Sequence, residues 1–113
     1  MKKYALVTGA SSGIGWHLSL ELAGRGYSIL AISNQPEGLE LLKAEVEKLP
    51  AVSCHTTNLN LATAGAADEV VALCNQHNMV PEILVNNAGI LVVGEFISRE
   101  PIKIRDILNL YHF

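Results

Sequence analysis

The chain of 113 residues is long enough for one domain with a buried core. Its formal net charge of −3 gives no reason to expect nucleic acid as a partner, because nucleic-acid binding typically requires a clustered basic face. No apolar run of about 18 residues is present, and Lys2 and Lys3 precede only the short run Tyr4–Val7, so we expect a cytoplasmic protein without a membrane span.

Short runs of β-forming residues alternate along the chain with longer segments of helical periodicity. The predicted strands are Tyr4–Val7, Ser28–Ile32, Ala51–His55 and Ile83–Val85. The apolar faces of the three intervening helices are Ile14, Leu18 and Leu22; Leu39, Leu42, Val46 and Leu49; and Ala67, Val70, Val71 and Cys74. Such alternation is typical of βαβ units, so we predict an α/β fold with a doubly wound parallel sheet and helices on both faces.

A fourth helix is predicted near the end of the chain. Pro101 suits a first helical turn, and Ile104, Ile107, Leu108 and Tyr111 then share one face. Half of the residues are hydrophobic, which indicates either a sheet buried on both faces or a surface that a partner or further chain covers.

The segment "LVTGASSGIGWHL", Leu6 to Leu18, leaves a predicted strand and opens a helix. Its glycines, Gly9, Gly13 and Gly15, allow a sharp turn and a close approach of backbone to phosphate. The N–H groups of the first helical turn would then face the anion. No Lys or Arg follows the glycines as a nucleoside-triphosphatase loop requires, and the spacing also differs from G-x-G-x-x-G. A glycine-rich turn without a ligand remains the alternative.

The spacing Thr8-Gly9-x-x-x-Gly13-x-Gly15, followed by "ILVNNAG" from Ile83 to Gly89, resembles the short-chain dehydrogenase/reductase family. The resemblance implies a Rossmann-type sheet of strand order 3-2-1-4 over residues 1–113. It also implies hydride transfer between a nicotinamide cofactor and an alcohol or carbonyl substrate.

The resemblance assigns roles to individual residues. Thr8 and Asn86 would connect neighbouring strands, Asn58 would accept from the adenine amino group, and Asn109 would lie at the active site, with its main chain binding a water. An ordinary helical Asn is the alternative for Asn109. The implied cofactor-binding residues are Gly9, Ser11, Ser12, Gly13, Ile14, Gly15, Ser33, Asn34, Asn58, Leu59, Asn87, Ala88 and Gly89.

The choice between NAD and NADP depends in this family on the end of the second strand. A carboxylate there favours NAD, because it accepts from the ribose 2′-OH and repels a 2′-phosphate. Ser33 and Asn34 stand at the deciding positions, and neither side chain is charged. Both side chains can donate to a phosphate, so we expect NADP; the alternative is that neither residue discriminates.

The family's acid–base chemistry requires a Ser and a Tyr-x-x-x-Lys motif, and none of the tyrosines has a Lys four residues later. We therefore expect a domain that is incomplete at its C-terminus, binds dinucleotide and does not catalyse hydride transfer by itself. A small-molecule substrate is expected only if more chain exists. A non-catalytic binding or subunit module and a truncated gene remnant are the alternatives.

Two surfaces of the predicted domain would be apolar: the edge of its sheet and the exposed face of the final helix. In a sheet of order 3-2-1-4 the strand Ile83–Val85 would be an edge, so we expect a homo-oligomer or aggregation unless more chain covers it.

The histidines share no metal-ligand spacing, and we expect no metal site. Cys54 and Cys74 lie outside any C-x-x-C motif and are expected to be free, buried thiols.

Overall fold

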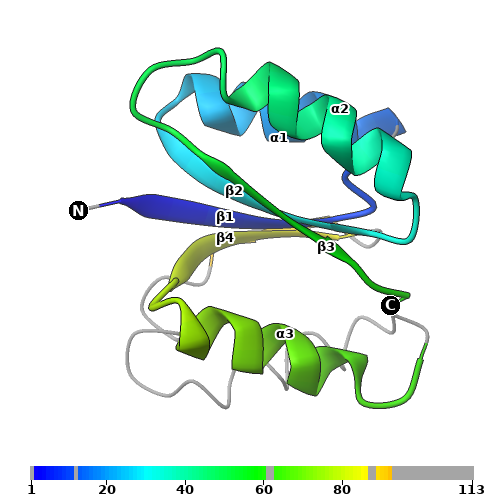
Figure 1. The fold of residues 1–113 in the computed structure, drawn as a ribbon. Helices are drawn as coiled ribbons and strands as arrows, with labels where there is room; N and C mark the ends of the chain where they lie inside the picture. Colours follow the sequence, from blue (N-terminus) through cyan, green and yellow to red (C-terminus); the bar gives the residue numbers. More distant parts are fainter. Residues whose placement is uncertain (1, 12, 61–62, 87–88, 93–113) are drawn as a thin grey trace.

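The computed structural model of the chain describes residues 2–11, 13–60, 63–86 and 89–92. Within these ranges, a central sheet is covered by α1 and α2 on one face and by α3 on the other (Figure 1). In chain order the elements are β1 (Lys3–Thr8), α1 (Gly13–Gly24), β2 (Tyr27–Ser33), α2 (Pro36–Val46), β3 (Cys54–Asn58), α3 (Ala66–Gln76), β4 (Pro81–Asn86) and β5 (Gly89–Val92). None of the described helices is long and apolar enough to cross a membrane.

The strands lie in the order β3-β2-β1-β4-β5, and the first four are parallel. Leu6 of β1 pairs with Leu30 of β2 on one side and with Leu84 of β4 on the other. This arrangement confirms the predicted α/β fold and the strand order 3-2-1-4. It also places the carboxyl ends of all four parallel strands at one edge of the sheet.

The prediction that β4 is an edge strand is wrong. β5 pairs with β4 in the antiparallel direction, with Ile83 opposite Val92 and Asn86 opposite Gly89. Only positions 87 and 88 separate that last pair, and such a short connection allows an antiparallel partner, whereas a parallel one requires a crossover. On this side, the edge of the described sheet is therefore β5, while β3 is the edge on the other side.

The two faces of the sheet carry separate apolar clusters, because successive side chains of a strand point to opposite faces. Ala5 and Val7 of β1 belong to the cluster beneath α1 and α2, whereas Leu6 belongs to the cluster against α3. The helix α2 contributes its buried residues Leu39, Leu42 and Val46 to the first cluster, and the predicted apolar face of this helix is confirmed for those three residues.

Three details of the predicted elements are wrong. The third strand begins at Cys54 and not at Ala51, since Ala51 adopts a left-handed φ of 66° in the turn after α2. Leu49 follows the end of α2 and is 36% exposed. Ile14 does not share a buried face with Leu18, because it lies in the first turn of α1 and is 77% exposed.

The two cysteines are free and buried, as predicted. Cys54 lies in the cluster under α1 and α2, and Cys74 lies in the cluster against α3. Burial raises the pKa of the Cys54 thiol to about 12 and that of the Cys74 thiol to about 11. Both thiols therefore stay protonated near neutral pH and serve as small packing residues.

The contribution of the first cluster is testable on α2. Leu42 is fully buried, whereas its neighbour Leu41 is 64% exposed. Leu42→Ala should lower the free energy of unfolding by about 2–5 kcal/mol, because it removes buried methyl groups and leaves a cavity. Leu41→Ala is the matched control and should change it by less than about 1 kcal/mol. Equal effects in urea unfolding would contradict the assigned core.

The second testable feature is His55 of β3, whose ring lies 6.1 Å from the Tyr4 ring and 6.4 Å from the His77 ring, measured between centroids. Its pKa is lowered, first by burial and then by the positive charge of Lys2, by His77 and by Lys43, with Glu47 acting in the opposite direction. The folded state therefore binds fewer protons at this site than the unfolded state does. His55 should reduce stability as the pH falls through the unfolded pKa, which is about 6.5.

We expect the native chain to lose free energy of unfolding between about pH 7.5 and about pH 5.5, and we expect His55→Gln to lose less over the same interval. His17, which is exposed on α1, provides the control substitution His17→Gln. Urea unfolding at both pH values measures the difference. A His55→Gln variant with the pH dependence of the native chain would disprove this assignment.

Candidate functional site

The glycine loop lies at the carboxyl end of β1, where the chain turns into α1. From β1 the chain passes through α1 to β2, which lies on one side of β1. On the other side of β1 lies β4, which follows α3 on the opposite face of the sheet (Figure 1). The direction of strand succession therefore reverses beside β1. In open α/β sheets, ligands bind at the carboxyl ends of the strands at such a reversal.

The backbone of the loop depends on its glycines. Gly9 and Gly13 have left-handed φ angles of 62° and 59°, which strain residues with larger side chains. A Cβ atom at Gly15 would lie 2.2 Å from the carbonyl oxygen of Gly9. The start of α1 thus packs directly on the end of β1, and only glycine permits this approach.

The first turn of α1 offers an environment for an anion. The N–H groups of a first helical turn have no partner within their helix, and the helix dipole is positive there. The turn contains no acidic residue that would repel an anion. Ile14 is 77% exposed beside it, so an apolar surface adjoins these N–H groups.

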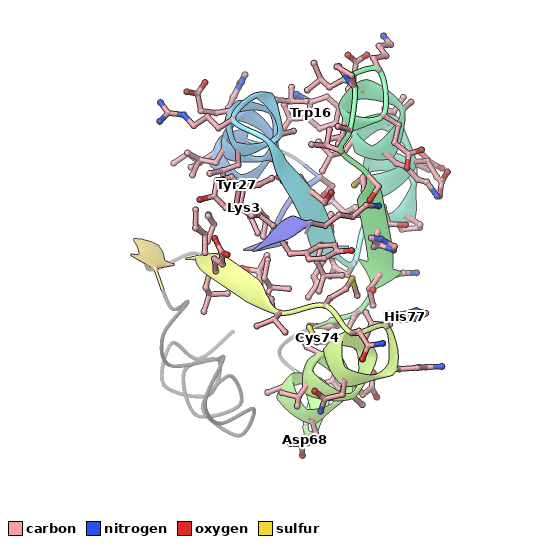
Figure 2. The ribbon with its side chains drawn as sticks, turned by 90° about the vertical axis from the view of Figure 1, so that its left-hand side faces the viewer. Lys3, Trp16, Tyr27, Asp68, Cys74 and His77 are labelled. Atoms are coloured by element: carbon pink, nitrogen blue, oxygen red, sulfur yellow. The ribbon has the colours of Figure 1, made fainter. Side chains whose placement is uncertain are left out.

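Trp16 follows directly on this turn. It is half-buried and packs against the cluster under α1 and α2. Figure 2 shows Trp16 on the side of α1 that faces α2. As the only tryptophan of the sequence, it gives a fluorescence signal from the immediate neighbourhood of the loop.

The loop also contacts the turn between β2 and α2. The hydroxyl oxygens of Ser11 and Ser33 lie 2.7 Å apart, and the Ser11 hydroxyl donates to Oε1 of Gln35 at 3.2 Å. The Gln35 N–H donates to the Ser33 hydroxyl oxygen at 3.1 Å. A Cβ atom at Gly38 of α2 would lie 2.6 Å from the Ser11 Cβ, so α2 begins in close contact with the loop.

The residues predicted near the adenosine come together at the carboxyl ends of β2 and β3. Ser33 pairs with Asn58 in the sheet, and the Leu59 N–H donates to the Ser33 carbonyl oxygen at 2.9 Å. Asn34 and Asn58 are exposed, whereas Ser33 is only 7% exposed and its hydroxyl is already engaged. Asn34 is thus more accessible to a ligand than Ser33.

The strand-connecting role that the resemblance implies for Thr8 is present in the structure. The Thr8 hydroxyl donates to the Val85 carbonyl oxygen at 3.3 Å and so links β1 to β4. Gly89 begins β5 opposite Asn86, at the same edge as the glycine loop. Four predicted site residues lie outside the described residues: Ser12, Asn87, Ala88 and Asn109.

Two residues of this junction were not predicted from the sequence. Gln35 follows directly on the pair Ser33 and Asn34, but its contact with Ser11 joins segments 24 residues apart and has no local signal. Gly38 did carry a signal, because a glycine inside a helix costs about 1 kcal/mol relative to alanine and so suggests a packing reason.

A metal site was not expected from the sequence. Within the described ranges, no group of three or more His, Cys, Asp or Glu side chains lies close enough together to hold a metal ion. The groups that the described site presents are backbone N–H groups, hydroxyls and side-chain amides around the glycine loop.

Comparison with known proteins relates the whole chain to one family of sequences. The family model described as short chain dehydrogenase matches residues 3–112. Among curated relatives, the very-long-chain 3-oxoacyl-CoA reductase of Debaryomyces hansenii is 34% identical over 110 residues, which are 96% of this chain and 32% of the relative. The NADPH-dependent pterin aldehyde reductase of Arabidopsis thaliana is 35% identical over 89 residues, which are 74% of this chain and 34% of the relative.

Solved structures of other proteins have a fold similar to that of this chain. L-sorbose reductase from Gluconobacter frateurii, in complex with NADPH and L-sorbose, matches 76% of this chain with a TM-score of 0.70 and 29% identity. An NAD+-bound xylitol dehydrogenase matches 77% of this chain with a TM-score of 0.69 and 30% identity. Each match covers 33% of the solved chain.

The glycine loop, the hydrogen bond from Thr8 to β4 and the strand order thus agree with a sequence match that extends over nearly all of the chain. The chain spans about a third of the length of the curated relatives that it matches. It belongs to the short-chain dehydrogenase/reductase family of oxidoreductases.

Proposed function

We propose that this chain is the dinucleotide-binding part of an NAD(P)-dependent oxidoreductase that transfers hydride between the cofactor and an alcohol or carbonyl substrate. The observation that carries the proposal is the close packing of Gly15 on the carbonyl of Gly9, at the point where strand succession reverses. This packing aims the first turn of α1 at the carboxyl edge of the sheet, where a diphosphate can bind.

The described residues fit such a cofactor. The Gly13 position has open space around it and a left-handed φ, so the backbone there is accessible to a phosphate. Ile14 offers an exposed apolar side chain next to these N–H groups. A bound nicotinamide cofactor would supply the hydride chemistry, while the chain binds and orients it and Thr8 holds β1 against β4.

We further propose NADP as the preferred cofactor. No carboxylate stands at Ser33 or Asn34 to repel a 2′-phosphate, and the exposed Asn34 amide can donate to one. The Arabidopsis relative is named an NADPH-dependent reductase, and the L-sorbose reductase structure contains NADPH, whereas the xylitol dehydrogenase structure contains NAD+. The runner-up is a site that accepts both cofactors equally.

The names of the relatives indicate a carbonyl or alcohol group in the substrate and little more. They include an oxoacyl-CoA reductase, a pterin aldehyde reductase and a farnesol dehydrogenase. The sizes and polarities of these substrates differ, while the matched segment is shared. We therefore assign the matched segment to cofactor binding and not to substrate choice.

The phosphate-binding role of the loop is tested by Gly13→Asp. NADPH should quench the Trp16 emission of the native chain by energy transfer, and the substitution should abolish this quenching because it puts a negative charge against the diphosphate. Gly13→Asn is the matched control, since Asn has the same shape and also tolerates a left-handed φ. Undiminished NADPH binding by a folded Gly13→Asp variant would disprove the assignment.

A second variant tests the close packing of the loop. Gly15→Ala puts a Cβ where only 2.2 Å separates it from the Gly9 oxygen, so the loop must open and binding should weaken by at least about tenfold. Gly24→Ala, at the end of α1, has no atom within 4 Å of the added Cβ and should leave binding unchanged. Isothermal titration with NADPH measures both, and similar affinities would contradict the packing argument.

A further inference from the structure

The strand β3 forms the edge of the described sheet on the side away from β5. It pairs with β2 from Cys54 to Asn58 without a break in register, and no described strand lies on its other side (Figure 1). An edge strand presents a row of backbone N–H and C=O groups without partners in the sheet, and such a row is a template for a further strand.

The hydrogen bonds at the two ends of β3 show which of its backbone groups point outward. The Ile29 N–H donates to the Ser53 carbonyl oxygen at 2.8 Å, and the Leu59 N–H donates to the Ser33 carbonyl oxygen at 2.9 Å. Ser53 and Leu59 thus both face β2, and the backbone groups of successive residues in a strand point to alternate sides. The outward-pointing residues between them are Cys54, Thr56 and Asn58.

Glu47 binds the first of these outward N–H groups. It follows directly on the last residue of α2, and its own N–H donates to the Lys43 carbonyl oxygen at 3.0 Å. The Cys54 N–H donates to Oε2 of Glu47 at 3.4 Å. Burial is the first cause of the raised pKa of Cys54, and the negative charge of Glu47 is the second, in agreement with this contact. The carboxylate therefore lies against the outer edge of β3.

The strand itself lacks the residues that usually prevent pairing at a sheet edge. Its sequence, Cys-His-Thr-Thr-Asn, contains no Pro, Lys or Arg, and it has two β-branched residues, which favour strand formation. The pKa of His55 is lowered, first by burial, so its imidazole is largely neutral near neutral pH. The charge at this edge is therefore supplied by Glu47, from outside the strand.

We propose that Glu47 blocks the free edge of β3 against a second copy of this chain, which would otherwise add its own β3 in the antiparallel direction. A carboxylate only accepts hydrogen bonds, and here it holds an N–H that the added strand needs. The incoming strand would have to displace the carboxylate and remove water from it, which is unfavourable for a charged group. This role does not depend on dinucleotide binding.

A second copy fits this edge because the outward groups are symmetric about Thr56. A two-fold axis through Thr56 places Cys54 opposite Asn58 of the other copy, so each outward N–H meets an outward C=O. The two strands carry no net charge of their own and would not repel each other. Pairing of this kind would continue one sheet through both copies.

Sedimentation equilibrium of the 113-residue chain and its variants tests the proposal by measuring the self-association constant. Glu47→Ala should raise this constant at least about tenfold, because it frees the Cys54 N–H and removes the charge. Glu45→Ala is the matched control, because it makes the same charge change at an exposed residue that pairs with Lys48. It should change the constant by less than about twofold.

Thr56→Pro determines whether any new association uses β3. Proline has no N–H, and the Thr56 N–H points away from β2, so the substitution removes a donor for the added strand and leaves the hydrogen bonds to β2 in place. The double variant Glu47→Ala/Thr56→Pro should therefore return to the self-association constant of the native chain. Thermal unfolding of each variant verifies that it is folded.

Amide hydrogen exchange tests the contact in the native chain, without any substitution. After correction for local sequence, the Cys54 N–H should exchange at least about tenfold more slowly than the Thr56 N–H, because only the former donates to Glu47. Equal exchange of the two amides would overturn the proposed block.

The outcomes of the sedimentation experiment are equally decisive. An unchanged self-association constant in a folded Glu47→Ala variant would overturn the proposal. An equal rise in Glu45→Ala would assign the effect to net charge and not to the edge of β3. A rise that persists in the double variant would assign the association to another surface, and the blocking role of Glu47 would again be disproved.

Discussion

The structure depends on the burial of β1 between β2 and β4. Its residues from Ala5 to Thr8 are all buried, so each backbone N–H and C=O must find its partner in a neighbouring strand. The Thr8 side chain adds a hydrogen bond to β4 at the point where the ladder ends. This constraint fixes the position from which the glycine loop leaves the sheet, and the orientation of α1 follows from it.

The loop is held from two further directions. Gly15 lets α1 pack on the end of β1, and Gly38 lets α2 approach Ser11. Both contacts are possible because glycine has no side chain, and a Cβ atom at either position would keep the segments further apart. The resulting surface presents helix N–H groups, hydroxyls and side-chain amides at the carboxyl edge of the sheet, which are groups that suit the dinucleotide site proposed for this edge.

Much of the fold was predictable because apolar periodicity is local information. The strands and helices were expected at nearly the observed positions, since βαβ units repeat a buried run and an amphipathic segment. The errors in the predicted strands occur where pairing between strands decides where a strand begins or which strand lies beside it. The third strand begins at Cys54 because its register with β2 starts there, and β5 covers β4 because Asn86 and Gly89 pair across a two-residue connection.

The sequence by itself determined the family, the glycine loop and the uncharged end of β2, because each is a pattern of neighbouring residues. The tertiary structure alone decided that Ile14 is exposed, that the buried Ser33 hydroxyl lies beside the Ser11 hydroxyl, and that Gln35 and Gly38 contact Ser11. These facts involve residues far apart in the chain or the direction of one side chain. They arise only when α1 and α2 pack on the same face of the sheet and bring the loop and the β2–α2 turn within hydrogen-bonding distance.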